Sequence, residues 1–202
     1  MTNLEDEEIK VILVGESGTG KTSLINITIG ETFVEGVEAS TSASSFVTKV
    51  IKFGDKSYRV NLWDTIGQEK FRSLTRIFIK DSKIVIFVYD ITNENSFKEI
   101  DKYWFKTIQD VLGDSPILGI VGNKQDLFVN EKVKEEVAEK YAEDKKAFFK
   151  YTSAKTPLSF ISFLEDLVKK YIEKCGGVVE TGDGKKLKTT NDDKPIKGRK
   201  FC

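Results

Sequence analysis

Short unbroken apolar runs alternate along this chain with segments in which apolar residues recur at helical spacing. Runs without alternation, such as residues 84–89 (Ile-Val-Ile-Phe-Val-Tyr), predict strands that are buried on both faces. A turn at Gly54-Asp55-Lys56 joins two of the strands into a hairpin, so one of them runs antiparallel to its neighbours. The predicted strands are residues 9–14, 46–53, 58–63, 84–89, 116–122 and 147–152.

Helical segments stand between most of these strands. Phe97, Ile100, Trp104 and Ile108 recur at roughly helical spacing, and Pro157 suits the first position of a helix. The predicted helices are residues 23–29, 96–112, 131–145 and 157–175, with a short helix near the end of residues 64–80. The alternation predicts a three-layer α/β fold, in which helices cover both faces of a six-stranded, mostly parallel sheet with one antiparallel strand.

Composition changes along the chain and divides it into three parts. We expect a short acidic extension at residues 1–8, one domain at 9–175 and a disordered, hypervariable tail at 176–202, where apolar residues are scarce. A length of 202 residues with 39% hydrophobic and 32% charged residues suits one globular domain with a tail. A formal net charge of zero argues against general nucleic-acid binding, although the tail itself is basic.

Residue usage limits the compartment and the chemistry. Two cysteines, Cys175 and Cys202, argue against a disulfide framework and for a reducing compartment. No apolar run reaches transmembrane length, and the acidic N-terminus is unlike a signal peptide, so we expect a cytoplasmic protein unless something attaches it to a membrane. The chain has no histidine, so its chemistry must rest on positioning and electrostatics.

The stretch from Gly15 to Ser23 matches the phosphate-binding pattern G-x-x-x-x-G-K-[ST], with a predicted strand before it and a helix after it. Its glycines let backbone N–H groups turn onto an anion, and the helix N-terminus adds partial positive charge. Lys21 supplies a charge for the outer phosphates, and the Thr22 hydroxyl can bind Mg²⁺. The predicted contacts to the nucleotide in this loop are Gly15, Glu16, Ser17, Gly18, Thr19, Gly20, Lys21, Thr22 and Ser23.

A second motif, Asp64-x-x-Gly67-Gln68, follows the strand at residues 58–63. Asp64 can hold Mg²⁺ directly or through water, as the aspartate after an apolar strand does in other phosphate-loop proteins. Gly67 allows a backbone N–H to approach the terminal phosphate. Gln68 can orient the water that attacks this phosphate, which makes it the candidate catalytic residue.

The base is chosen by Asn123-Lys124-x-Asp126, together with Ser153-Ala154-Lys155 after the last strand. The Asp126 carboxylate can accept two parallel hydrogen bonds from guanine, which adenine cannot supply. The stem of Lys124 can lie along the ring, and Asn123 can tie the base loop to the phosphate loop. The backbone N–H of Ala154 can reach the guanine oxygen, so GTP and GDP are the predicted ligands.

These motifs together resemble the Ras superfamily of small GTPases over about residues 9–175. Leu62 to Thr75 and Tyr89-Asp90-Ile91-Thr92-Asn93-x-x-Ser96-Phe97 resemble its Rab branch. The resemblance implies a phosphate-loop NTPase fold and a monomer that switches with GTP and GDP in vesicle trafficking, with effectors, an exchange factor and a GTPase-activating protein as partners. It also implies that Thr41 reaches Mg²⁺ when GTP is bound, that Phe33 edges onto the guanine, and that effectors contact Phe46, Trp63 and Phe78. Sheet core is the alternative for these last three residues.

The chain departs from the Rab pattern at several positions. Ile66 stands where alanine is common beside the nucleotide, and Phe33 lies one residue further from Thr41 than expected. Ser17 stands where many relatives have glycine, although Rab proteins tolerate serine there. A nearly non-hydrolysing GTP-binding scaffold is therefore the alternative, whereas a metabolic kinase or ATPase is disfavoured by the Asn-Lys-x-Asp motif. The chain ends in Cys202, whose prenylation would carry the protein to the cytosolic face of an endomembrane with help from the basic tail; an incidental cysteine on a solvated tail is the alternative.

Overall fold

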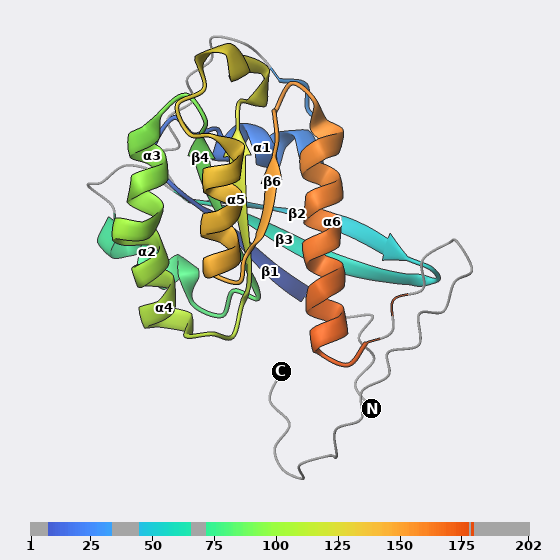
Figure 1. The fold of residues 1–202 in the computed structure, drawn as a ribbon. Helices are drawn as coiled ribbons and strands as arrows, with labels where there is room; N and C mark the ends of the chain where they lie inside the picture. The colour runs from blue at the N-terminus through green and yellow to red at the C-terminus, as the bar shows by residue number, and fades with distance from the viewer. Residues whose placement is uncertain (1–7, 34–44, 66–71, 178, 180–202) are drawn as a thin grey trace, which may run out of the picture.

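The computed structural model describes residues 8–33, 45–65, 72–177 and 179. Its centre is a six-stranded sheet in the order β2-β3-β1-β4-β5-β6 (Figure 1). β2 and β3 pair antiparallel, and every other pair in the sheet is parallel. The strands are β1 (Glu8–Val14), β2 (Ser45–Phe53), β3 (Lys56–Asp64), β4 (Ile84–Asp90), β5 (Ile117–Asn123) and β6 (Phe148–Tyr151). The predicted fold is confirmed, and the predicted strand ends are shifted by one or two residues.

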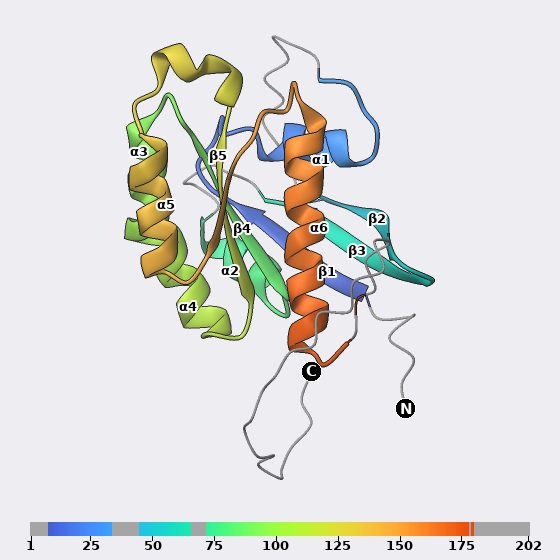
Figure 2. The ribbon, with the colours of Figure 1, turned by 45° about the vertical axis from the view of Figure 1, so that its right-hand side comes forward.

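Helices cover both faces of the sheet (Figures 1 and 2). α1 (Lys21–Thr28) and α6 (Pro157–Lys174) pack on one face. The other face carries α2 (Arg72–Ile79), α3 (Glu94–Glu99), η3 (Ile100–Phe105), α4 (Lys106–Leu112) and α5 (Glu135–Asp144). Side chains of β1 alternate between the two layers, because Val11 and Leu13 join the core under α1 and α6, whereas Ile12 and Val14 join the core on the other face.

The helix predicted at residues 96–112 differs from the structure in two ways. It begins at Glu94, since the side chain of Asn93 caps it by accepting a hydrogen bond from the backbone N–H of Asn95 at 3.1 Å. Its middle, η3, is a π-helix between two α-helical parts. The helical residues Ile100, Trp104 and Ile108 are all buried, so the apolar face is the one that the spacing predicted.

The start predicted for the helix at residues 131–145 is wrong. Residues 125–130 form a short 3₁₀ helix, η4 (Gln125–Asn130), and α5 begins only at Glu135. The link between them makes tertiary hydrogen bonds, because the N–H of Lys132 donates to the Ile91 carbonyl at 2.8 Å and the Tyr151 hydroxyl donates to Glu131 at 2.7 Å. These bonds hold the link against β6 and the end of β4 in place of a further helical turn.

Among the helices of the described ranges, none is both long enough and apolar enough to cross a membrane.

Candidate functional site

The predicted motifs follow the carboxyl ends of β1, β3, β5 and β6. These strands are parallel to one another, and β1 lies between β3 and β4 in the middle of the sheet. Their loops therefore meet at one edge of the sheet, which is where ligands bind in open α/β folds. The end of β4 contributes Asp90 to the same edge.

The phosphate loop has no room for side chains at two of its glycines. A Cβ on Gly15 would lie 2.1 Å from the backbone oxygen of Val88, and one on Gly20 would lie 2.3 Å from Nδ2 of Asn123. Gly20 also has a φ of 92°, in the left-handed region. The loop therefore passes directly against β4 and against the base motif.

Lys21 is buried inside this loop, and 5% of its surface is exposed. Its Nζ donates to the carbonyls of Gly15 and Glu16, each at 2.9 Å, so the ammonium group is held across the loop. Burial lowers the pKa of Lys21 to about 8, while the charges of Asp64 and Glu16 act in the opposite direction. The loop thus concentrates positive charge where the motif predicts phosphates.

Two oxygen-bearing side chains stand next to this lysine. The hydroxyl of Thr22 donates to Oδ2 of Asp64 at 2.6 Å, and 4% of Asp64 is exposed. The following residue, Thr65, donates from its hydroxyl to the Leu13 carbonyl at 2.6 Å and fixes the start of the loop after β3. A hydroxyl and a carboxylate form a hard oxygen donor set that fits Mg²⁺ with phosphate oxygens as further ligands. The described residues contain no group of three or more His, Cys, Asp or Glu that could hold a metal by themselves.

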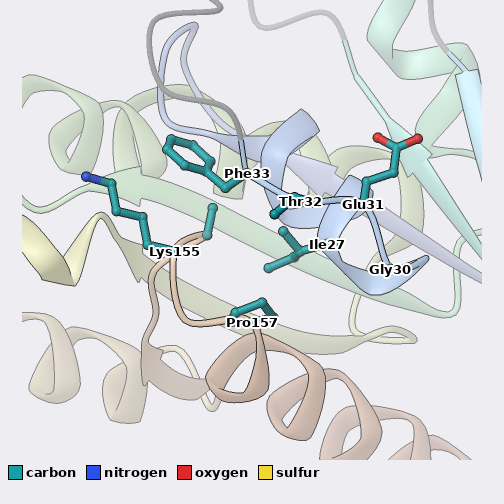
Figure 3. Close-up of a pocket in the computed structure, with 8 residues that line it drawn as sticks. Ile27, Gly30, Glu31, Thr32, Phe33, Lys155 and Pro157 are labelled. Atoms are coloured by element: carbon teal, nitrogen blue, oxygen red, sulfur yellow. The ribbon is translucent and has the colours of Figure 1, made fainter.

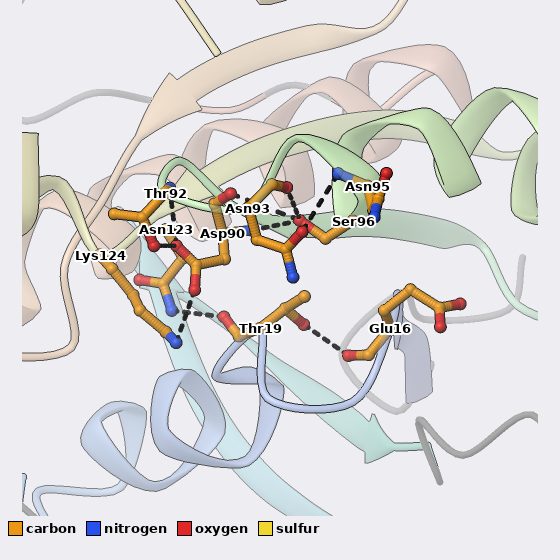
Figure 4. A network of polar contacts seen from close by, with 9 residues as sticks. All are labelled: Glu16, Thr19, Asp90, Thr92, Asn93, Asn95, Ser96, Asn123 and Lys124. Carbon is orange, nitrogen blue, oxygen red and sulfur yellow. Dashed lines mark hydrogen bonds and ion pairs between the residues drawn. The ribbon is translucent and has the colours of Figure 1, made fainter. Parts of the chain in front are cut away.

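Asn123 joins the base motif to the phosphate loop (Figure 4). Its Nδ2 donates to the carbonyl of Thr19 at 2.8 Å, and the side chain is buried. The hydroxyl of Thr19 in turn donates to the carbonyl of Glu16 at 2.9 Å. The shape of the phosphate loop therefore depends on a residue more than a hundred positions away in the chain, since Thr19 and Asn123 are 104 residues apart.

An ion pair fixes Lys124 at the same edge (Figure 4). Its Nζ lies 2.7 Å from Oδ2 of Asp90, and its backbone has a left-handed φ of 66°. The other oxygen of Asp90 accepts from the N–H of Thr92 at 2.8 Å and from its hydroxyl at 2.7 Å. Both oxygens of the largely buried Asp90 carboxylate thus have partners, and the Lys124 side chain is fixed within the base motif.

The carboxylate of Asp126 is held by the Ser153-Ala154-Lys155 loop. Oδ1 accepts from the Ser153 hydroxyl at 2.6 Å, and Oδ2 lies 3.3 Å from Nζ of Lys155. Burial acts to raise the pKa of Asp126, but hydrogen bonds from Ser153 and Lys155 outweigh it and keep the pKa below its usual value. The group is therefore an ionised acceptor at neutral pH.

Phe33, Ala154 and Lys155 line one cavity of about 620 Å³ (Figure 3). Nζ of Lys155 lies 5.9 Å from the centre of the Phe33 ring. The cavity continues between the end of α1, at Ile27, and the start of α6, at Pro157. The structure thus brings Phe33 to the base motif in spite of its unexpected spacing from Thr41.

The three aromatic residues predicted to meet effectors lie together, and we name Phe46, Trp63 and Phe78 the aromatic surface. Phe46 stacks on Trp63 with ring centres 4.9 Å apart, and Trp63 lies 6.1 Å from Phe78. Phe46 is 51% exposed, whereas Trp63 and Phe78 are partly buried against the core. The predictions for Thr41, Gly67, Gln68 and Cys202 fall outside the described residues.

Sequence reasoning gave no role to two residues of this edge. Asp90 was part of a stretch that resembled the Rab branch, and its position next to the base motif follows only from the pairing of β4 with β5. Trp104 was placed in the core by its spacing. Its indole N–H in fact donates to Oε1 of Glu16, in the phosphate loop, at 3.2 Å. No signal in the sequence indicates this contact.

A mostly parallel sheet with a phosphate loop, a threonine–aspartate oxygen pair and an Asn-Lys-x-Asp loop at one edge defines a guanine-nucleotide-binding domain. The sequence model of the Ras family matches residues 10–173 of this chain. Ras-related protein Rab-21 of Bos taurus is 41% identical over 164 residues, covering 81% of this chain and 73% of that protein. Rab-21 of Homo sapiens is 38% identical over 194 residues, covering 92% and 85%. Rab-26 of Bos taurus is 40% identical over 154 residues, covering 76% and 60%.

The chain therefore belongs to the Ras family, in its Rab branch. It is a small GTPase that binds GTP and GDP and hydrolyses GTP, as its motifs predicted, and it has regulators and effectors as partners, as the family resemblance implied. It is a Rab-like small GTPase involved in vesicle trafficking.

Proposed function

We propose that this GTPase recognises guanine through Asp126, with Ala154, Phe33 and Lys124 around the base. The observation that carries the proposal is the ionised Asp126 carboxylate, held by Ser153 and Lys155 next to the cavity that Phe33 lines. A carboxylate that is fixed in this way accepts the two parallel N–H groups of guanine at no further cost in side-chain entropy. Adenine would leave it unsatisfied.

The phosphates lie in the loop from Gly15 to Ser23, and Mg²⁺ is held by Thr22 and Asp64, with Thr41 as a third contact in the GTP state. The donor set supports this assignment, because the hydroxyl of Thr22 and the carboxylate of Asp64 already lie 2.6 Å apart. A bound Mg²⁺ would neutralise charge on the phosphate oxygens. Lys21 adds a buried positive charge on the protein side.

Hydrolysis depends on Gln68, which orients the attacking water, and on the N–H of Gly67 at the terminal phosphate. The switch consists of the segments that contain Thr41 and Gln68, which respond to the presence of that phosphate. A nearly non-hydrolysing GTP-binding scaffold is the alternative, because Ile66 and Ser17 depart from the usual residues. Single-turnover hydrolysis of GTP separates the two, since a scaffold would retain GTP through the assay.

Partners contact the aromatic surface when GTP is bound, and the protein acts as a monomer. The support is the half-exposed ring of Phe46 on the edge strand β2, which stacks on Trp63 of β3 and follows Thr41 by five residues in the chain. Prenylation of Cys202 attaches the protein reversibly to the cytosolic face of an endomembrane, assisted by Lys197, Arg199 and Lys200.

Replacement of Asp126 tests the assignment of the base site. We expect Asp126→Ala to weaken GTP binding at least 100-fold, since a charged bidentate contact is worth about 3 kcal/mol or more. Competition with labelled GDP measures the affinity. Asp114→Ala is the matched control, because Asp114 is an exposed carboxylate in the turn before β5, at the opposite edge of the sheet. Equal affinity of the wild type for ATP and GTP would reject guanine selectivity.

A further inference from the structure

Glu16 places a carboxylate in a loop whose other features attract anions. The loop combines backbone N–H groups, the N-terminus of α1 and the buried ammonium of Lys21. A carboxylate that folded inward would occupy the same positive field as a phosphate and would repel it. The direction of this one side chain therefore affects phosphate binding.

The contact to Trp104 gives Glu16 its direction. The indole N–H donates to Oε1 of Glu16 at 3.2 Å, and Trp104 is 1% exposed within the core on the α2–α5 face of the sheet. In Figure 4 the Glu16 carboxylate points away from Thr19 and from the inside of the loop. The side chain is thus drawn toward the helical layer, while its carbonyl holds Lys21 inside the loop.

The position of Trp104 depends on the π-helical segment. Trp104 lies in η3, four residues after buried Ile100 and four before buried Ile108. Tyr103 packs its ring edge-on against Trp104, with ring centres 4.9 Å apart. The hydroxyl of Thr107 donates to the carbonyl of Tyr103 at 2.8 Å, in the pattern by which threonine adapts a helix locally. π-Turns are rare, and they recur where a helix places a residue at a functional site.

We propose that Trp104 is a positioning residue for the nucleotide: it holds the carboxylate of Glu16 outside the phosphate loop, so that this charge does not oppose the phosphates. This inference rests on the proposed placement of the phosphates between Gly15 and Ser23. It links η3 to the affinity for nucleotide through one hydrogen bond to a charged group.

A double-mutant cycle with Trp104→Phe and Glu16→Gln tests the proposal. Phenylalanine keeps an aromatic ring but cannot donate, so we expect Trp104→Phe to weaken GTP binding about tenfold, as expected for one charge-assisted hydrogen bond. The loss should be larger for GTP than for GDP, because GTP carries more charge. Glu16→Gln removes the negative charge that Trp104 keeps outside the phosphate loop. The double variant should therefore bind GTP within about threefold of Glu16→Gln alone. Additive losses would overturn the proposal.

Ile108→Val is the matched control for packing, since Ile108 is buried in the same core and on the same continuous helical stretch. Its effect on GTP affinity should be unchanged by Glu16→Gln.

Should Trp104→Phe fail to fold, the indole N–H signals in the NMR spectrum of the full chain supply a second test. The chain has two tryptophans, and Trp63→Phe assigns the remaining signal to Trp104. Glu16→Gln must shift the Trp104 signal, and an unchanged signal would overturn the proposal.

The same experiments distinguish this inference from the proposed nucleotide site. If the wild type binds GTP and Lys21→Met abolishes binding, the phosphates lie in the loop, and an additive cycle then rejects only the role of Trp104. If Lys21→Met binds GTP as the wild type does, the phosphate placement itself is wrong.

Discussion

Gly15 shows how tightly one residue constrains this nucleotide site. We expect Gly15→Ala to reduce the free energy of unfolding by at least about 2 kcal/mol, because the new methyl would lie 2.1 Å from a backbone oxygen of β4 that cannot move aside. Gly18→Ala is the control, since a Cβ added there would lie more than 4 Å from every atom outside the adjacent residues. Its only cost is the strain of a side chain at a φ of 76°, which is about 1–2 kcal/mol. Urea unfolding measures both, and equal losses would contradict the structure.

Lys21 makes nucleotide affinity depend on pH. Its pKa of about 8 in the free protein means that the ammonium loses its proton as the pH rises through 8, whereas phosphates favour the charged form. We expect the affinity for GTP to fall by up to about tenfold per pH unit above pH 8, with proton uptake on binding. Calorimetry in two buffers of different ionisation heat measures this uptake.

The matched variant for this pH dependence is Lys21→Arg, whose guanidinium keeps its charge and should give a flat profile. The free energy of unfolding of the nucleotide-free protein should change with pH in the opposite sense to the GTP affinity. The pKa of Lys21 is lower in the folded chain than the 10.5 of an ordinary lysine, so the unfolded chain binds more protons between these values. Stability therefore rises with pH in this window, and a GTP affinity that also rose would contradict the assignment.

Residues that carry chemistry at a fixed spacing could be predicted from the sequence. The lysine and threonine of the phosphate loop, and the aspartate that holds a base, each sit in a motif whose spacing follows from one strand and one turn. Asp90 and Trp104 could not be predicted in this way, because each acts through a partner on another element: Lys124 for Asp90, and Glu16 for Trp104. Such pairs depend on sheet order and on helix rotation.

At the scale of elements, the π-helical segment is tied to α5 by a compact charged cluster. Nζ of Lys145 lies 3.0 Å from Oδ1 of Asp101 and 4.4 Å from the centre of the Phe105 ring. The hydroxyl of Tyr141 donates to the same Asp101 oxygen at 3.1 Å. The hydrogen bond from Lys145, supported by Tyr141 and opposed by partial burial, keeps the pKa of Asp101 below its ordinary value.

Asp101→Asn should therefore destabilise the protein in a pH-dependent way. A carboxyl with a lowered pKa contributes stability above its unfolded pKa, near 4, and loses it as the pH falls through the folded value. We expect a loss of about 0.5–1 kcal/mol at pH 7, because the Asp101 side chain is 61% exposed and solvent screens its interaction with Lys145, and a smaller loss near pH 3. Urea unfolding at both pH values checks this, with Asp114→Asn as control. A loss that is independent of pH would assign the effect to packing.

Periodicity located the helices but not their ends. The apolar spacing of residues 96–112 predicted the buried face, yet a π-turn differs from an α-turn by one residue and leaves the same residues buried. Before α5, Lys132 and Glu131 are polar residues of good helical propensity, yet they bond to Ile91 and Tyr151 instead. Tertiary contacts override propensity here, and they are not visible in a local pattern.

At the scale of the whole molecule, the alternation of strands and helices was enough to predict three layers and a mostly parallel sheet. The hairpin turn at Gly54 predicted which strand runs antiparallel, and the structure has this pairing from Ser45 to Phe53 against Lys56 to Asp64. The order of the strands needed the structure. Buried strands such as β1, β4 and β5 have equivalent apolar patterns, so nothing local shows which of them lie side by side.

Attachment of the whole molecule to membranes should depend on Cys202. We expect Cys202→Ser to move the protein to the soluble fraction, because a prenyl chain contributes about 0.8 kcal/mol per buried CH₂ and the basic tail alone binds weakly. Fractionation and the intact mass of protein from its native cell measure this. Neutralising Lys197, Arg199 and Lys200 should weaken binding in a salt-dependent manner. An unmodified Cys202 in the membrane-bound pool would reject the lipid anchor.

The direction of α6 has a practical consequence for work with this protein. Its last turn, where Lys174 donates to the Ser115 carbonyl at 2.7 Å, lies at the same end of the molecule as the beginning of β1 (Figures 1 and 2). The nucleotide edge is at the other end, about 27 Å away along an 18-residue helix. Fluorescent labels or affinity handles joined beyond either end of the domain therefore emerge on one side, and a sensor chip that captures them leaves the nucleotide edge open to solution.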